Sequence, residues 1–236
     1  FAPALAERLA AVAEEPGPAL MLVAASIGKA KDRSGRTGAD AVLNIDAPQL
    51  KGTITLSGTP NIDLARVGDL AALRANEFKF ETSLTAKQAA TMVTLLDLGR
   101  IISPGDGPAQ FESSVTGVWG SPLQLKAKLT GAGLDGDIQG TGNPWADQPT
   151  AALTVAVRRA DLAALFDLKP ASVPSLGVSL SSRIGVAGNT FTFDDLDATA
   201  GGSRVRGRLV LTRGEETGVD GEIGLDTLDL AAVTGV

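Results

Sequence analysis

The chain has 236 residues, with 21 Lys and Arg against 27 Asp and Glu, and its formal net charge at pH 7 is -6. This acidic balance argues against a nucleic acid partner, because a phosphate backbone is bound by a basic surface. Cysteine and histidine are both absent from the sequence. Their absence excludes disulfides, thiolate and Ser-His nucleophiles, and zinc sites built from these ligands. We therefore expect no cofactor and no bound metal ion.

The chain begins at Phe1, and no basic segment with an apolar run precedes its first amphipathic stretch. We interpret it as a fragment of a longer protein whose targeting or membrane segment lies elsewhere. No window within it approaches the roughly 18 uninterrupted apolar residues that a membrane-spanning helix requires.

The first part of the chain changes from a helical to a β pattern. Leu5, Leu9 and Val12 form one apolar stripe of a helix within residues 1–15. The apolar run from Ala19 to Ala25 predicts a strand, and the basic run from Lys29 to Gly38 predicts a solvated loop after it. A hairpin is then predicted from two alternating segments around a turn, Ala41–Ile45 and Leu50–Leu56.

The next segment is the most helical part of the sequence. Two short helical turns are expected from Asp63 and from Asp69, and Phe78 and Phe80 open a further strand. Thr85 is a candidate N-cap for a helix over residues 86–98 that ends at Gly99. The buried stripe of this helix is expected to consist of Ala89, Met92, Val93 and Leu96.

The rest of the chain is dominated by strands. Alternation of apolar and polar residues predicts strands at 111–118, 123–129, 134–138, 153–157, 178–186, 191–198, 205–211 and 219–225. We expect Thr141–Pro144 to interrupt the run of strands after the first three, and short helical turns to begin at Asp161 and Asp229. Phe191 and Phe193 share a face with Leu196 and Ala198 only when one residue bulges near Asp194 and Asp195.

Two sections of the sequence can be superimposed at an offset of about 70 residues. Leu134–Ile138 aligns with Val205–Leu209, and Asp161–Ala164 aligns with Asp229–Ala232. We predict a mainly β fold with a few short helices, an elongated, twisted or rolled antiparallel sheet of repeated helix-plus-four-strand units. The predicted divisions are residues 1–85, 86–160 and 161–236. An ordinary β-sandwich is the alternative.

The hairpin from Phe191 to Leu209, the strand at Val219–Ile223 and the ending Leu228–Val233 resemble the repeating module of the AsmA family. The resemblance is best from Ala86 to Val236. It implies a periplasmic body of a cell-envelope protein, involved in outer membrane biogenesis and anchored to the inner membrane through a segment outside this chain. Related bridge-like lipid transfer proteins hold phospholipid chains in an apolar groove of a rolled sheet. The family has no catalytic motif, so we expect no enzyme activity.

Two functions follow for the same alternating side chains. In the first, they line a groove for phospholipid or another acyl-chain lipid. In the second, they form the dry core of a periplasmic scaffold that binds envelope proteins. The candidate groove residues are Val155, Val157, Ile184, Val186, Phe191, Phe193, Val205, Leu209, Leu211, Ile223 and Leu225.

Polar and aromatic candidates are fewer. Asp194, Asp195 and Asp197 lack the glycine and distal Glu of a calcium loop, so we interpret them as charges on a solvated strand edge. Glu215 or Glu216 with Asp220 would supply the carboxylate pair of a glycosidase, but no aromatic sugar platform accompanies them. The tryptophans, Trp119 and Trp145, are expected to plug the end of a core, with membrane-interface anchoring as the alternative.

Overall fold

The computed structural model describes residues 20–29, 37–58, 77–99, 102–161, 177–200, 203–214 and 217–226, with the backbone alone for 20–29, 37–39 and 161. This part of the chain forms one sheet of twelve strands and one short helix. The elements are β1 (Leu20–Lys29), β2 (Thr37–Asp46), β3 (Leu50–Gly58), β4 (Glu77–Ala86), α3 (Ala89–Leu95), β5 (Ala109–Val118), β6 (Leu123–Gly131), β7 (Leu134–Asn143), β8 (Thr150–Asp161), β9 (Gly177–Ala187), β10 (Thr190–Ala200), β11 (Ser203–Thr212) and β12 (Gly218–Leu225). The predicted mainly β fold is confirmed.

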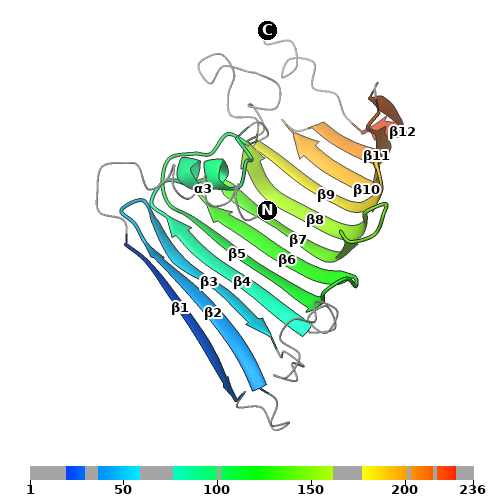
Figure 1. Ribbon diagram of the computed structural model, residues 1–236. Coiled ribbons are helices and arrows are strands. Elements are labelled where there is room, and N and C mark those ends of the chain that lie inside the picture. Colours follow the sequence, from blue (N-terminus) through cyan, green and yellow to red (C-terminus); the bar gives the residue numbers. More distant parts are fainter. Residues whose placement is uncertain are drawn as a thin grey trace.

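The strands follow one another in the sheet in the same order as in the sequence, and each is antiparallel to its neighbours. The sheet is open, with β1 and β12 as its edges, and its strands rotate progressively along the molecule (Figure 1). Both boundaries between the predicted divisions, after residues 85 and 160, fall within strands, namely β4 and β8. The sheet therefore continues across both positions.

Strand formation follows the alternation of side chains. In β4 the side chains of Phe78, Phe80 and Leu84 are partly or fully buried, whereas those of Glu77 and Lys79 are exposed. Such a strand is stable only where one face meets apolar groups and the other meets water. The other predicted strands also form, with ends that differ by a few residues.

The predicted break at Thr141–Pro144 is placed too early, because β7 continues to Asn143. Gly140 and Gly142 pair with Leu153 and Ala151 of β8. Backbone pairing on this side supplies the hydrogen bonds that fix the glycine-rich end of the strand.

The helix predicted over residues 86–98 is shorter than expected. Thr85 and Ala86 belong to β4, where they pair with Gln110 and Ala109 of β5, so Thr85 does not cap the helix. The N-cap residue is Gln88, whose side chain makes no capping hydrogen bond. Sheet pairing at this position therefore outweighs the local capping preference of threonine.

The helix also ends earlier than predicted, at Leu95 rather than next to Gly99. Asp97 adopts φ 60° in the left-handed region. Its N–H donates to the Thr94 carbonyl at 3.1 Å, and the Leu98 N–H donates to the Val93 carbonyl at 2.9 Å. This pattern is a Schellman motif, in which Asp97 occupies the position that glycine usually takes. Leu98 packs beside Val93 as a result.

The most buried part of the molecule lies where α3 covers one end of β4 and β5 (Figure 1). Met92 is fully buried there, and Ala89 and Val93 are buried as predicted, while Leu96 is only partly buried. The residues packed together with Met92 are Ile45, Leu50, Leu84, Ala86, Ala89, Leu95 and Ala109. We call the edge of the sheet that carries α3 the helix rim.

No helix among the described residues is long and apolar enough to cross a membrane. Several predictions fall outside the described residues and are not tested by them. They are the helical stripe in residues 1–15, most of the basic loop, the helical turns predicted within 63–73, at 162–166 and at 229–233, and the candidate carboxylates Glu215 and Glu216.

Candidate functional site

The strand register brings apolar side chains from most of the sheet onto a single face. Phe111 of β5 pairs with Leu84 on one side and with Leu129 on the other, and Leu129 in turn pairs with Gly136. Because side chains alternate along a strand, paired positions point to the same face. We call this face, from β2 to β12, the inner face.

All of the candidate groove residues lie on the inner face. Phe191 pairs with Val186 and Leu211, and Phe193 pairs with Ile184 and Leu209. The remaining pairs connect Val155 and Val157 to β7, and Val205 to Leu225 on β12. The last member, Ile223, pairs with Gly207, which lies between Val205 and Leu209 on β11.

Sequence reasoning missed the continuation of this face into the first half of the sheet. Apolar and polar residues alternate in β3 to β7 as well, but the candidate groove residues come only from β8 to β12. Large apolar residues of the inner face that are not among the candidate groove residues include Leu43, Ile54, Leu56, Phe78, Phe80, Leu84, Phe111, Val115, Leu123, Leu125, Leu129, Ile138, Leu153 and Leu180.

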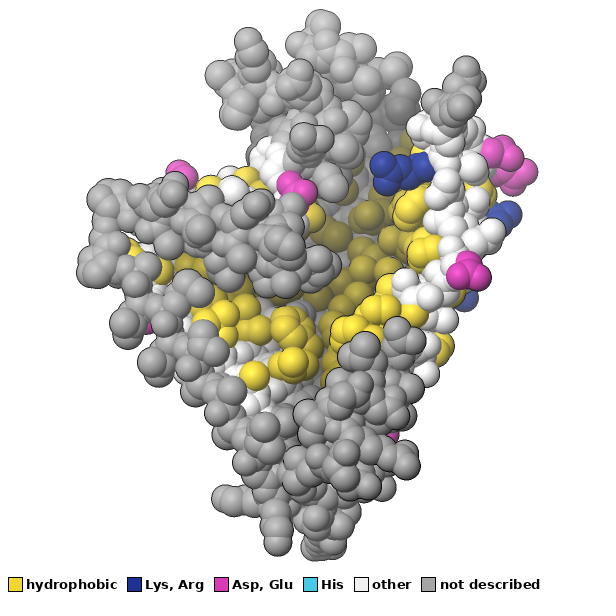
Figure 2. All heavy atoms as spheres, viewed as in Figure 1, with side chains coloured by type: hydrophobic (Ala, Val, Ile, Leu, Met, Phe, Trp, Pro, Cys, Tyr) yellow, Lys and Arg dark blue, Asp and Glu magenta, His cyan; other side chains and the backbone are white. Residues whose placement is uncertain are grey.

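The inner face has no charged side chain at any described position, and its polar residues are Thr82, Ser113, Ser182 and Ser203. Much of it remains accessible. Leu56 is 47% exposed, and at the β12 edge Val219 and Leu225 are 68% and 55% exposed. Figure 2 shows hydrophobic side chains gathered in a hollow on the face turned to the reader. An accessible apolar surface of this extent is typical of a binding site.

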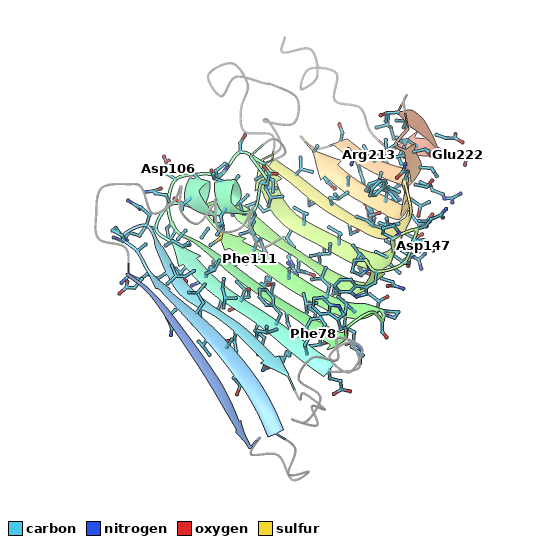
Figure 3. All side chains as sticks on the ribbon, viewed as in Figure 1. Phe78, Asp106, Phe111, Asp147, Arg213 and Glu222 are labelled. Carbon is cyan, nitrogen blue, oxygen red and sulfur yellow. The ribbon has the colours of Figure 1, made fainter. Side chains whose placement is uncertain are left out.

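A cavity of about 270 Å³ lies on the inner face next to the helix rim. Leu96, Leu98 and Ile102, which follow α3, form one wall. The sheet contributes Phe111, labelled in Figure 3, together with Leu129, Leu134, Ile138, Val155, Val157 and Ala160, and the charged residues Lys128, Asp135, Asp137 and Arg159 also border the cavity. The Schellman motif at Asp97 directs the chain toward this wall. The cavity is therefore an apolar recess between the sheet and the segment after the helix.

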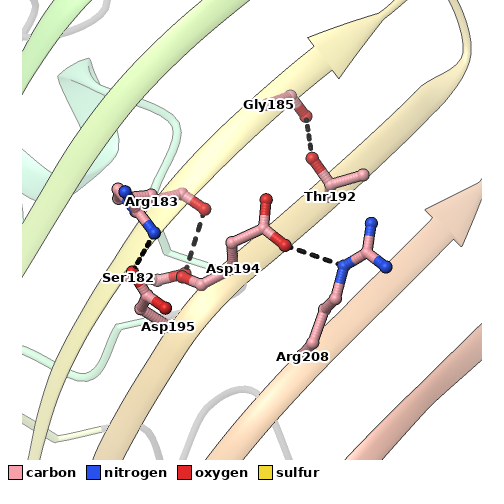
Figure 4. A network of polar contacts seen from close by, with 7 residues as sticks. All are labelled: Ser182, Arg183, Gly185, Thr192, Asp194, Asp195 and Arg208. Atoms are coloured by element: carbon pink, nitrogen blue, oxygen red, sulfur yellow. Dashed lines mark hydrogen bonds and ion pairs between the residues drawn. The ribbon is translucent and has the colours of Figure 1, made fainter.

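The opposite, outer face is polar, and the three aspartates of β10 lie there in ion pairs with arginines. Asp194 accepts a hydrogen bond from Arg208 Nε at 2.7 Å, and Asp195 pairs with Arg183 (Figure 4). Asp197 pairs with Arg204. The interpretation of these aspartates as a strand edge is wrong, because β10 pairs with β9 and β11 on its two sides. Their charges are neutralised by cross-strand arginines instead.

The predicted bulge in β10 is confirmed. The pairing with β11 shifts between Phe193 and Leu196, and Asp195 has φ 50°. The bulge keeps the residues on both sides of it on the inner face. The bulge also explains why the polar Ser182 lies on the inner face. The Ser182 hydroxyl donates a hydrogen bond to the Asp194 carbonyl oxygen in the bulge at 3.0 Å (Figure 4).

A second bulge, not predicted, lies in β8 between Val157 and Ala160. Arg158 within it reaches across to β7, where its Nη1 donates to Asp135 Oδ1 at 2.8 Å and its Nη2 donates to Asp137. The hydrogen bond with Asp137 and the charge of Asp135 raise the pKa of Arg158 above its ordinary value. The guanidinium group thus bridges two carboxylates on the outer face.

The two tryptophans lie at the edge of the sheet opposite the helix rim. Trp119 follows β5 directly and Trp145 follows β7, and their ring centroids are 4.6 Å apart. Trp119 is 49% exposed and Trp145 is 41% exposed. The prediction that they plug the end of a core is wrong, because a core plug is buried.

No group of three or more His, Cys, Asp or Glu side chains in the described part of the chain is arranged to hold a metal ion. Comparisons with protein-family models, with curated proteins and with solved structures give no match. The candidate site therefore rests on the geometry of the inner face.

Proposed function

We propose that the inner face binds the acyl chains of phospholipids, and that the chain is a non-catalytic, lipid-carrying part of a cell-envelope protein of the AsmA type. The observation that carries this proposal is the continuous, accessible and uncharged inner face of an open sheet. A hydrocarbon chain needs a long apolar surface and no specific polar partner. The inner face offers such a surface.

The energy scale is adequate for binding. Removing one methylene from water contributes about 0.8 kcal/mol. Ten methylenes laid along the strands would therefore contribute about 8 kcal/mol before the entropic cost of association. Micromolar binding requires about 8 kcal/mol after that cost has been subtracted, so both acyl chains of a phospholipid have to lie on the inner face. The cavity near Leu98 and Ile102 offers deeper burial for part of a chain.

The finer parts of the proposal have two sources. A periplasmic location and an inner membrane anchor in the parent protein come from the resemblance, and a fold made of helix-plus-four-strand repeats comes from the internal alignment of the sequence. The element order supports the repeat, since four strands, β5 to β8, follow α3, and four more, β9 to β12, follow residues 162–176. The competing function is a protein-binding scaffold, in which the inner face is covered by protein.

Lipid uptake by a matched pair of variants on β8 tests the proposal. Val155 is on the inner face, whereas Thr154 is exposed on the outer face between Gln139 and Arg183. Val155→Asp places a carboxylate in the acyl-chain path, and we expect a decrease of at least about tenfold in uptake of a fluorescent phospholipid. Thr154→Asp places the same charge beside Arg183, and we expect unchanged uptake.

Native mass spectrometry of the gently purified protein provides the second readout, and circular dichroism establishes that both variants fold. The groove is supported if the wild type and Thr154→Asp carry bound phospholipid and Val155→Asp does not. A lipid-free wild type that also takes up no labelled lipid contradicts it. Unfolding of Val155→Asp in such a lipid-free protein favours the scaffold.

A further inference from the structure

The two tryptophans meet although they come from different strand ends. β5 and β7 run in the same direction on either side of β6, so their last residues lie at the same edge, roughly 10 Å apart. Trp119 and Trp145 bridge this distance, with ring centroids 4.6 Å apart at 32°. Phe78, which is labelled in Figure 3 and belongs to the inner face, lies 5.8 Å from the Trp119 ring.

Hydrogen bonds hold the backbone of both turns that carry the tryptophans. The Ser121 N–H donates to the Val118 carbonyl at 3.0 Å, which closes the turn containing Trp119. The Trp145 N–H donates to Asn143 Oδ1 at 3.3 Å. The aromatic pair is therefore held on a defined part of this edge, which we call the tryptophan rim.

The exposure of the tryptophan pair needs an explanation. After stacking on each other, the two indoles still leave nearly half of their surface in water. Indole rings combine a large apolar surface with one N–H donor, and they are enriched at the boundary between hydrocarbon and water in membranes. The tryptophan rim also continues into the inner face through Phe78.

The charges on this rim indicate which membrane surface it fits. Its described turns are residues 119–122, 144–149, 188–189 and 213–214, and they carry one acidic residue, Asp147, and one basic residue, Arg213 (Figure 3). The rim therefore has no net charge in these turns, and the whole chain has a net charge of -6. An anionic surface would repel the protein, whereas a zwitterionic surface would not.

We propose that Trp119 and Trp145 dock the tryptophan rim onto the interface of a zwitterionic phospholipid bilayer. The proposal rests on the proposed function, because docking there places the open inner face next to the lipids that it takes up. The helix rim, covered by α3, faces away from the bilayer in this arrangement.

Intrinsic fluorescence is a direct test, because the chain contains two tryptophans and no tyrosine. The tryptophan emission of the protein therefore reports on Trp119 and Trp145 alone. Phosphatidylcholine vesicles are expected to shift the emission to shorter wavelength, and brominated phosphatidylcholine is expected to quench it. Replacing part of the phosphatidylcholine with phosphatidylglycerol is expected to weaken both effects. Emission that is unchanged by vesicles overturns the proposal.

Vesicle flotation gives the second test. The double variant Trp119→Ala and Trp145→Ala is expected to lose vesicle binding by at least about tenfold. Thr154→Ala, which shortens a side chain exposed on the outer face of β8, serves as a control and is expected to float like the wild type. Equal flotation of the double variant and the wild type overturns docking through the rim. If the double variant does not fold, quenching of the wild type decides the question.

Uptake of a labelled lysophospholipid below its micellar concentration separates docking from lipid binding, because it needs no vesicle. Retained uptake by the folded double variant, with lost flotation, supports the proposal. Uptake without flotation in the wild type overturns docking and leaves the proposed function intact. Flotation without uptake contradicts the proposed function and removes the basis of the docking proposal.

Discussion

The Asp197 carboxylate accepts two hydrogen bonds from the Arg204 guanidinium group across β10 and β11, at 2.8 Å from Nε and 2.5 Å from Nη2. Arg206, directly opposite Asp197 in the register, lies 3.5 Å away through its Nε. The outer face is thus held by charge pairs next to a bulge, whereas the inner face of the same hairpin carries Phe191, Phe193, Leu209 and Leu211. The two faces of one hairpin are stabilised by different forces.

This pairing makes the hairpin sensitive to acid. The hydrogen bond from Arg204 lowers the pKa of Asp197 below its ordinary value of 3.8, assisted by the charges of Arg204 and Arg206 and opposed by partial burial. The folded state therefore binds a proton less readily than the unfolded state. The stabilisation is complete above the ordinary pKa and is lost as the pH falls through the lowered pKa.

Asp197→Asn tests this effect. At pH 7 the variant is expected to have a slightly lower thermal midpoint than the wild type, and the difference is expected to vanish when the pH falls below the lowered pKa of Asp197. Thermal unfolding followed by circular dichroism from pH 7 to pH 2 measures it. A difference that stays constant over this range would show that Asp197 acts through something other than its charge.

Met92 provides a prediction about the helix rim. Met92 is fully buried between α3 and the sheet, so Met92→Ala is expected to reduce the free energy of unfolding by about 2–5 kcal/mol. Thr94 is exposed on the same helix, and Thr94→Ala is expected to change the free energy of unfolding by less than about 0.5 kcal/mol. Chemical denaturation measures both. Equal values would mean that α3 does not pack on the sheet.

Gly207 is a position where the backbone requires glycine. It has φ 157°, and a β-carbon there would collide with the Glu222 carbonyl oxygen of β12. Gly207→Ala is expected to lower the free energy of unfolding by about 1–3 kcal/mol. Gly224 on β12 has space for a β-carbon, with its nearest neighbour the Arg206 carbonyl oxygen at 3.8 Å. Gly224→Ala is therefore the control, and a loss of stability as large as that of Gly207→Ala would contradict the argument.

Val157 tests whether the cavity contributes to lipid binding. Val157 lines the cavity opposite Gly136, so Val157→Phe is expected to fill part of the space. The change in folding free energy is expected to be within about 3 kcal/mol, because the added ring enters an existing space. The amount of bound phospholipid per protein, measured by native mass spectrometry, is expected to decrease. An unchanged amount would place the bound chains elsewhere on the inner face.

The sequence by itself determined the strands and their two faces. Alternation is a local property, so residues such as Phe191, Phe193, Leu209 and Leu211 could be assigned to one face without knowledge of the fold. The bulge in β10 was also predictable, because Leu196 lies on the same face as Phe193 only if the strand contains one extra residue between them. The repeated helix remained an expectation, since its predicted positions outside α3 are not among the described residues.

Only the tertiary structure decided how far the apolar face extends and what lies at its rims. Pairing between strands is non-local, and it placed Thr85 in a strand instead of a helix cap and Asp194 opposite arginines instead of at an edge. It also brought Trp119 and Trp145 together across β6. These contacts depend on sheet order and register, which alternation along one strand does not specify.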